Sequence, residues 1–167
     1  MGDKVALRSL DDYEFREYED GDNLFLVEDE FAPVDCEIFR CWVAVDTTKQ
    51  MVVAMLDMSI PKASLAYEVE KAIKDKRPSG CKHPGGAIGA MYKLVVAEKW
   101  KKAGLEAGLL SKTFQDLPKV KPNWDVVYVW ANPADGPRIA LYKEAKFIKI
   151  LDNQGASKLQ AYARYNK

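Results

Sequence analysis

Cysteine and histidine are scarce in this sequence, which contains three cysteines and one histidine among its 167 residues. Cys36, Cys41 and Cys81 are odd in number and show no Cys-x-x-Cys spacing, which argues against a disulfide framework and against a zinc site. We therefore expect them to be small packing residues. His83 stands in a Lys-His-Pro-Gly-Gly segment that is typical of a loop, and one histidine cannot build a histidine-rich metal site. No metal is expected.

Long apolar runs are also missing. The N-terminal Met-Gly-Asp-Lys lacks the apolar core of a signal peptide. No apolar stretch approaches the roughly 20 residues that a membrane-spanning helix needs. We therefore expect no membrane partner and a reducing, cytoplasmic compartment.

Net charge is absent as well, since 25 lysines and arginines balance 25 aspartates and glutamates. A chain without a global basic field is not typical of nucleic-acid binding. The two signs are nevertheless distributed unevenly. Acidic residues outnumber basic ones in the first forty residues, and basic residues outnumber acidic ones over residues 71–121. Two solvated faces would explain this pattern. The alternative is an anionic ligand near the middle of the chain and a cationic partner near its front. The basic stretch lacks the interleaved aromatic residues of a stacking platform, so no nucleic-acid partner is expected.

The pattern of apolar residues and turn residues predicts one α/β domain over residues 1–167. Strands are expected over 5–8, 39–45, 51–58, 87–96, 125–131, 147–151 and 158–165, and helices over 62–75, 100–117 and 137–145. Residues 153–155 are expected to form a turn. The strand over 125–131 is apolar on both faces, which indicates a central position in the sheet. Residues 11–37 are acidic and weakly periodic, and both short helical turns and an irregular cover remain open for them.

The junction between the expected strand ending at Val96 and the helix that follows carries the strongest chemical signal. A buried strand leads into a short basic loop with Lys101 and Lys102, and a helix begins at once. The free N–H groups of a first helical turn, together with the positive end of the helix dipole, favour a phosphate. Gly104 permits a close approach of the backbone. An ordinary strand–loop–helix connection with solvated lysines is the alternative.

This junction resembles the first signature of the GCN5-related N-acetyltransferases. That signature is a strand ending Leu-x-Val, the motif Arg/Gln-x-x-Gly-x-Gly/Ala, and a helix with two neighbouring leucines. Lys101 stands at the Arg/Gln position, Gly104 at the first glycine and Glu106 at the second Gly/Ala position, with Leu109 and Leu110 as the leucine pair.

A second segment resembles the family's second signature, a strand followed by a short helix ending Leu-Tyr-x-x-x-Gly-Phe. Here the strand is Val126–Trp130, and Leu141-Tyr142 is followed by Lys146-Phe147, so that lysine replaces the glycine. The resemblance covers roughly residues 39–151. It implies a mixed, mostly antiparallel central sheet with helices on both faces.

The resemblance also implies that acetyl-coenzyme A (acetyl-CoA) is the cosubstrate. Its pantetheine arm would pair with the backbone of the strand residues Leu94, Val95 and Val96. Its pyrophosphate would lie against the loop and the first helical turn, which here consist of Lys101, Lys102, Ala103, Gly104, Leu105, Glu106 and Ala107.

The chemistry implied by the resemblance is direct attack of a primary amine on the thioester. A backbone N–H of Val95 or Val96 would stabilise the oxyanion, and Tyr142 would protonate the departing thiolate. A core tyrosine is the alternative reading of Tyr142. The acceptor would be a small-molecule or peptide amine, and the acidic segment Asp11–Glu37 favours a cationic one. We expect a monomer or a homodimer.

Two questions stay open at the level of sequence. Three carboxylates are candidates for helping the amine to lose its proton, and position does not choose among them: Glu37, Asp57 and Glu98. The second question is whether the protein has useful catalytic turnover. Glu106 and Lys146 depart from the family pattern, and they favour the alternative of a catalytically weak acyl-CoA-binding module that serves as a sensor or an interaction domain.

Overall fold

The computed structural model describes residues 10–24, 35–152 and 158–167. The strand expected over 5–8 and the turn expected over 153–155 lie outside the described residues. Along the chain the elements are η2 (Leu10–Asp12), β1 (Tyr13–Glu17), β2 (Arg40–Asp46), β3 (Met51–Ser59), α2 (Tyr67–Asp75), β4 (Ala87–Val96), η3 (Glu98–Ala103), α3 (Leu105–Val120), β5 (Trp124–Ala131), α4 (Gly136–Glu144), β6 (Ile148–Leu151) and β7 (Gln160–Tyr165).

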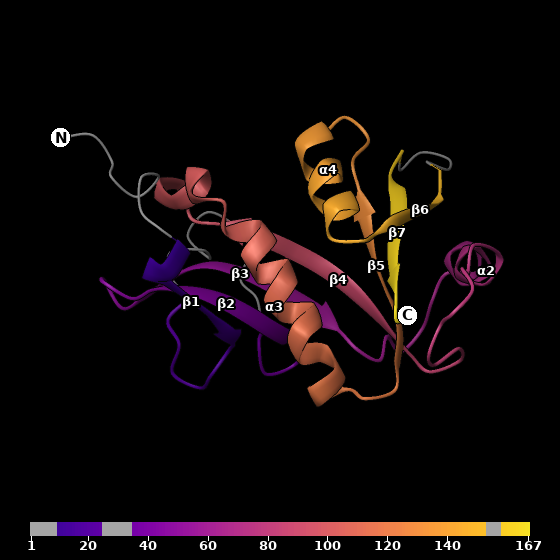
Figure 1. The fold of residues 1–167 in the computed structure, drawn as a ribbon, viewed down its shortest axis with the longest axis horizontal. Coiled ribbons are helices and arrows are strands. Elements are labelled where there is room, and N and C mark those ends of the chain that lie inside the picture. The colour runs from indigo at the N-terminus through magenta and orange to yellow at the C-terminus, as the bar shows by residue number, and fades with distance from the viewer. Residues whose placement is uncertain (1–9, 25–34, 153–157) are drawn as a thin grey trace. The chain divides into compact units, whose positions relative to one another are not determined.

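The strands form a seven-stranded sheet in the order β1-β2-β3-β4-β5-β7-β6 (Figure 1). Strands β4 and β5 are parallel, whereas β1 with β2, β2 with β3, β5 with β7 and β6 with β7 are antiparallel. This confirms the predicted α/β class with a mixed, mostly antiparallel sheet. The chain divides into two compact units, Met1–Met58 with Lys93–Asp116, and Ser59–Tyr92 with Leu117–Lys167. Strand β4 and helix α3 contribute residues to both units.

The first unit contains a strand in the segment that the sequence left open. Strand β1 has the sequence Tyr-Glu-Phe-Arg-Glu, and it pairs with β2 from Tyr13 opposite Asp46 to Glu17 opposite Trp42. Its first four residues alternate between aromatic and charged side chains, and Tyr13 is buried whereas Glu14 is exposed, as in a strand with one face toward solvent. Strands β2 and β3 are buried along almost their whole length, as their apolar runs predict.

Helix α3 packs closely against one face of the first unit's strands (Figure 1). The Trp42 indole Nε1 donates a hydrogen bond to the Asp116 carboxylate at 3.2 Å. A Cβ atom at Gly108 would lie 2.5 Å from Cζ of Phe15, so only glycine fits there without a shift of the ring. Because Phe15 lies opposite Ala44 and Glu17 opposite Trp42, Phe15 and Trp42 lie on the same face of the sheet.

The second unit has a helix on each face of its strands. Val69 and Ile73 of α2 pack in one buried cluster with Val126, Tyr128 and Tyr165. Arg164 lies opposite Val127 in the register of β5 and β7, and therefore on the other face. On that face its guanidinium Nη1 donates to the carbonyl of Ala145, the C-terminal cap of α4, at 3.2 Å. In this unit, α2 and α4 thus cover opposite faces.

The predicted start of α2 and the predicted end of α3 are wrong. Helix α2 begins at Tyr67 instead of residue 62, because the Lys62 N–H donates to the carbonyl of Ile88 at 2.7 Å and Ala66 is still extended. Helix α3 ends at Val120 instead of residue 117. Pro118 therefore lies inside its last turn, where a proline costs the helix only one late hydrogen bond.

The expectation that the cysteines form no disulfide is also wrong. Cys36 and Cys41 are bonded, with a Cα–Cα distance of 5.6 Å, and Cys81 is a free thiol. The turn between them explains the pairing, because the N–H groups of Ile38 and Phe39 both donate to the carbonyl of Asp35. This turn folds the chain back so that residues five positions apart meet. An odd number of cysteines leaves room for one such pair.

Over the described ranges, no helix is long and apolar enough to cross a membrane. Within the same residues, no cluster of three or more histidine, cysteine or acidic side chains could hold a metal ion.

A bidentate ion pair between Arg77 and Asp125 links separate segments of the second unit. The Arg77 guanidinium donates to the two oxygens of Asp125 at 2.6 and 2.7 Å, and the Gly85 N–H donates to the same carboxylate at 3.2 Å. Asp125 is buried, and its hydrogen bond to Arg77 raises the pKa of the guanidinium. Asp125 belongs to β5, so its carboxylate connects this strand to the loop after α2 and to the loop before β4.

Replacing Asp125 with alanine is expected to lower the free energy of unfolding by about 2–4 kcal/mol, because it leaves a half-buried guanidinium without its partner. Urea denaturation followed by circular dichroism measures the change. Asp75→Ala is the matched control: it removes a carboxylate from the exposed pair with Lys71 and should cost less than about 1 kcal/mol. Equal losses in the two variants would contradict the role given to Asp125.

Candidate functional site

The end of β4 brings the predicted strand residues to the edge of the first unit. Strand β4 pairs in parallel with β5 from Ala87 to Met91, so Leu94, Val95 and Val96 lie beyond that register. Leu94 and Val96 are buried, whereas Val95 is partly exposed. The Ala97 N–H donates to the carbonyl of Val53 at 2.8 Å, which fixes the end of β4 beside β3. The backbone that the resemblance assigns to the pantetheine arm is therefore held by the neighbouring strand.

The helix predicted from residue 100 is interrupted, which corrects the sequence expectation. Residues Glu98–Ala103 form the 3-10 helix η3, and α3 begins only at Leu105. Gly104 separates the two with a left-handed φ of 72°. A non-glycine residue would be strained in that conformation. The break places the first N–H groups of α3, those of Leu105, Glu106 and Ala107, directly after the basic loop, where a first helical turn has no internal acceptors.

The loop carries more positive than negative side chains. Lys99, Lys101 and Lys102 are exposed, and Ala103 is half-buried between them and Gly104. Lys101 Nζ lies 3.5 Å from a Glu98 oxygen, and such an exposed contact contributes little. Glu106 is half-buried in the first turn of α3, where the helix dipole favours a carboxylate. The geometry suits an anion bound by backbone N–H groups and lysines.

Tyr142 belongs to α4 in the second unit. It is 5% exposed, its ring centroid lies 5.5 Å from that of Phe147, and its carbonyl accepts the Phe147 N–H at 3.0 Å. Burial raises the pKa of the Tyr142 phenol, and the nearby positive charge of Arg138 opposes this in part. Tyr142 is therefore a protonated phenol at neutral pH, a state in which it can act as a proton donor.

The three carboxylate candidates have different surroundings. Asp57 is buried and accepts the Lys93 N–H at 2.6 Å, which holds its carboxylate beside β4. Glu37 and Glu98 are exposed, and Glu98 lies near Lys101. The described contacts do not bring these three carboxylates together.

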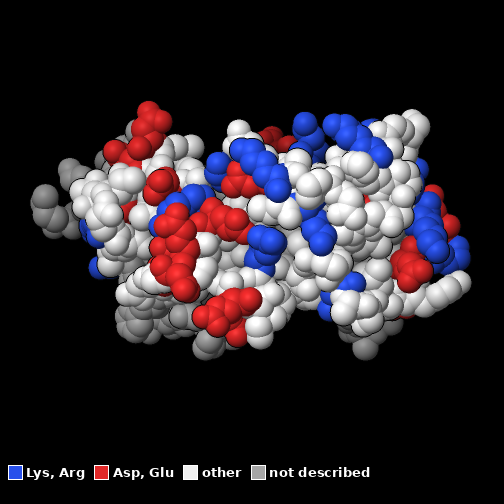
Figure 2. Space-filling model, turned by 90° about the horizontal axis from the view of Figure 1, so that it is seen from below, with Lys and Arg blue, Asp and Glu red and all other residues white. Residues whose placement is uncertain are grey.

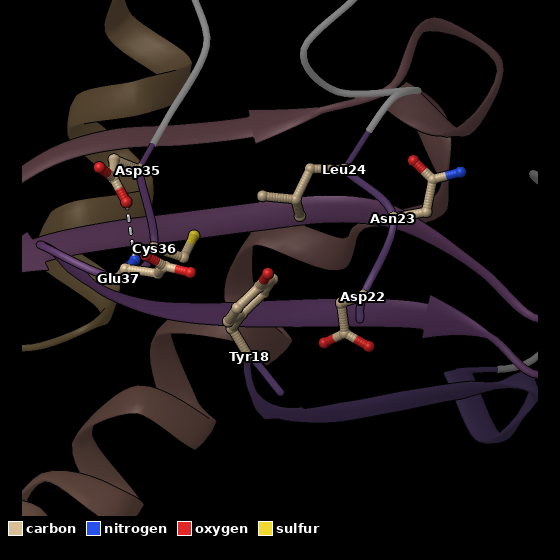
Figure 3. A pocket seen from close by; sticks show the side chains of 7 residues that line it. All are labelled: Tyr18, Asp22, Asn23, Leu24, Asp35, Cys36 and Glu37. Carbon is tan, nitrogen blue, oxygen red and sulfur yellow. Dashed lines mark hydrogen bonds between the residues drawn. The ribbon is translucent and has the colours of Figure 1, made fainter. Parts of the chain in front are cut away.

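A pocket of about 310 Å³ lies in the first unit (Figure 3), lined by Tyr18, Asp22, Asn23, Leu24, Asp35, Cys36 and Glu37. The Tyr18 N–H donates to the carbonyl of Cys41, which places the pocket near the start of β2. Asp22 accepts two hydrogen bonds from Arg16, at 2.8 and 2.9 Å, and they hold the pKa of its carboxyl below the usual range.

Among the described residues that line this pocket there is no lysine or arginine. Acidic side chains gather on part of the molecular surface, with several basic ones between them (Figure 2). The acidic run in the sequence was the signal for this region. It did not reveal the pocket, because the lining residues come together only through pairing of the chain near Tyr18 with β2.

Comparison with known proteins gives a fold. No protein-family model matches the sequence, and no curated protein does. Solved structures do match. Arabidopsis thaliana NAA60 in complex with acetyl-CoA is 18% identical, with a TM-score of 0.64 and coverage of 92% of this chain and 99% of that one.

Two bacterial structures are similar to a comparable degree. The ribosomal-protein-S5-alanine acetyltransferase of Vibrio fischeri is 11% identical, with a TM-score of 0.62, and the spermidine N-acetyltransferase of Vibrio cholerae is 10% identical, with a TM-score of 0.60. Both likenesses cover 93% of this chain and 94% of the other. At these identities the likeness shows the fold alone, which is that of the GCN5-related N-acetyltransferases.

Lys146 explains how this chain keeps the fold without the glycine of the second signature. It has a φ of 71°, which is the left-handed conformation that glycine adopts without strain. Its N–H donates to the carbonyl of Lys143 at 3.0 Å and closes the end of α4. The departure at Lys146 therefore changes the residue type but not the path of the backbone.

Lys146→Gly is expected to raise the free energy of unfolding by about 0.5–1 kcal/mol, because relief of left-handed strain exceeds the extra chain entropy of glycine. Thermal unfolding measures this. The matched control is Lys143→Gly, an exposed lysine inside α4, where glycine should cost about 1 kcal/mol. If both variants lose stability, Lys146 is not strained.

Proposed function

We propose that this protein is an acetyl-CoA-dependent N-acetyltransferase that transfers an acetyl group to a primary amine by direct attack. One observation carries the proposal. In a chain with this fold, the end of β4 leads through a lysine-rich loop and the left-handed Gly104 into the N-terminus of α3. A solved structure with the same fold contains acetyl-CoA.

The cosubstrate would bind mainly through backbone groups. The pyrophosphate would accept hydrogen bonds from N–H groups between Lys101 and Ala107, with Lys101 and Lys102 adding charge. The pantetheine arm would follow Leu94, Val95 and Val96 as an added strand. Backbone recognition tolerates changes of side chain, which is consistent with conservation of the fold at low identity.

The reaction would need no enzyme nucleophile. The neutral amine attacks the thioester carbonyl, and the oxyanion that forms accepts a hydrogen bond from the N–H of Val95 or Val96. Collapse of the tetrahedral intermediate breaks the C–S bond, and Tyr142 donates its phenolic proton to the departing thiolate. A carboxylate accepts the proton that the amine loses, directly or through water. Glu37, Asp57 and Glu98 remain the candidates for this role.

The acceptor would be a cationic small-molecule or peptide amine. The carboxylates of the first unit, including those of the pocket near Tyr18, attract positive charge, and charge attraction accelerates encounter. Two similar structures belong to proteins named for spermidine and for the alanine of a ribosomal protein, both of which carry amines. We also propose that the protein acts in the cytoplasm as a monomer or homodimer. Free-thiol titration tests the compartment, because the Cys36–Cys41 bond would be reduced there.

Binding of acetyl-CoA tests the core of the proposal. Isothermal titration calorimetry of the wild type should detect binding, and acetyl-CoA should raise the melting temperature. Glu106→Ala should bind about tenfold more tightly at low salt, because it removes a carboxylate near the pyrophosphate. The gain should shrink as salt increases. Absence of both heat and thermal stabilisation at millimolar ligand would refute the proposed function.

Tyr142→Phe should lower kcat by about tenfold to a thousandfold and leave the Kd for CoA nearly unchanged, as expected for loss of a general acid. Thiol release with a panel of amines measures kcat. Tyr165→Phe is the matched control: it removes a buried phenol that donates to the carbonyl of Ile73 on the α2 face. That variant should lose stability but keep its turnover. Equal turnover in Tyr142→Phe and the wild type would return Tyr142 to a packing role.

A further inference from the structure

Asp46 is a wholly buried carboxylate at the end of β2, with 0% of its surface exposed. One oxygen accepts the N–H groups of Thr48 and Lys49, at 3.0 and 3.1 Å. The other accepts the indole Nε1 of Trp100 at 3.1 Å. A buried carboxylate is stable only with such partners. Asp46 therefore joins two separate segments, the turn between β2 and β3 and the helix η3.

The sheet explains why these segments meet. Strand β2 is antiparallel to β3, and the Ala97 N–H donates to the carbonyl of Val53 near the start of β3. The turn at residues 47–50 and the loop after β4 consequently lie at the same edge of the first unit. Trp100 is 4% exposed and belongs to η3, between the exposed Lys99 and Lys101. Its position determines how η3 presents those lysines.

The turn also brings a charge to the loop. Lys49 Nζ lies 5.4 Å from the centroid of the Trp100 ring, a cation–π arrangement, and Lys49 is exposed. The carboxylate of Asp46 is buried, and it accepts hydrogen bonds from the backbone N–H of Lys49 and the indole of Trp100. The Lys49 ammonium therefore lies beside η3, the element that carries Lys99, Lys101 and Lys102, although Lys49 is about fifty positions away from them in sequence.

We propose that the β2–β3 turn is part of the phosphate-binding site for CoA, with Lys49 as a phosphate ligand and with Asp46 and Trp100 as positioning residues. This inference rests on the proposed function. Lys49 would contact the pyrophosphate or the 3′-phosphate, which present the same chemistry. Asp46 and Trp100 act through the loop and touch no ligand.

Trp100→Phe tests the positioning role, because it keeps an aromatic ring and removes the indole donor. The Kd for CoA should rise about fivefold to twentyfold, because η3 loses the hydrogen bond to Asp46 that holds its lysines in place for the phosphates. The kcat/KM for acetyl-CoA should fall by a similar factor. The kcat/KM for S-acetylpantetheine, which has no phosphate, should stay the same. A merely structural role would lower the values for both cosubstrates.

The first unit offers a matched control in Trp42→Phe. It also removes an indole–carboxylate hydrogen bond at a buried tryptophan, but the partner is Asp116, in the C-terminal half of α3. This variant should lose comparable stability and keep the wild-type Kd for CoA. If Trp42→Phe and Trp100→Phe weaken CoA binding equally, the positioning role is wrong.

Lys49→Gln tests the ligand role without disturbing the buried network. The Kd for CoA should rise about threefold to fivefold at low salt and less at high salt. Dephospho-CoA distinguishes the two phosphates: loss of the effect with this ligand assigns Lys49 to the 3′-phosphate, and an unchanged effect assigns it to the pyrophosphate. Lys71→Gln in α2 is the control and should change nothing. If the wild type binds CoA but Lys49→Gln binds equally well, Lys49 is not a phosphate ligand, whereas a wild type that binds no CoA refutes the proposed function itself.

Discussion

The backbone of β4 must satisfy its hydrogen bonds along ten residues, and the rest of the structure depends on how it does so. From Ala87 to Met91 it pairs with β5, and the carbonyl of Ile88 also accepts the N–H of Lys62. Beyond that register the Lys93 N–H is bound by the Asp57 carboxylate, and Ala97 is bound to Val53. Leu94, Val95 and Val96 lie between these two fixed points. The same requirement that builds the sheet therefore prepares the segment at which an extended ligand would pair.

Three buried carboxylates connect the segments of the chain. Asp46, Asp57 and Asp125 are each almost completely buried, and each accepts at least one backbone N–H. Asp125 joins loops of the second unit, Asp57 holds β4, and Asp46 holds η3. A buried charge is tolerated only where several donors surround it, so these positions mark the places where separate segments must meet in one geometry. In the proposed CoA site, Asp46 would therefore act on the loop at η3 without touching a phosphate.

The two departures from the family pattern have different physical consequences. Lys146 has the left-handed backbone that the family's glycine provides, so the cost of the substitution is local strain and the fold is kept. Glu106 is compatible with the N-terminus of α3, but its charge would oppose a bound pyrophosphate. Lys99, Lys101 and Lys102 are exposed in η3, directly before the same turn, and their positive charges would oppose the effect of that carboxylate. Neither departure alters the path of the chain through the candidate site.

Elements with long apolar runs could be predicted from the amino-acid sequence without any tertiary information. Strand β4 has the predicted bounds, and β3 and β5 differ by one residue at one end. Strands β3 and β5 are buried along almost their whole length, and such a strand shows in its apolar composition alone. The residues of the junction at Lys101–Ala107 are contiguous in the sequence, so their pattern can be read without knowledge of the fold. The remaining features depend on contacts between distant segments. Strand β1, with its alternating charges, needs β2 to become a strand, and the Cys36–Cys41 bond needs a turn. Strands β2 and β4 are both antiparallel neighbours of β3, so they end at the same edge, and this brings Asp46 and Lys49 to Trp100. No local sequence pattern encodes a contact between residues more than fifty positions apart.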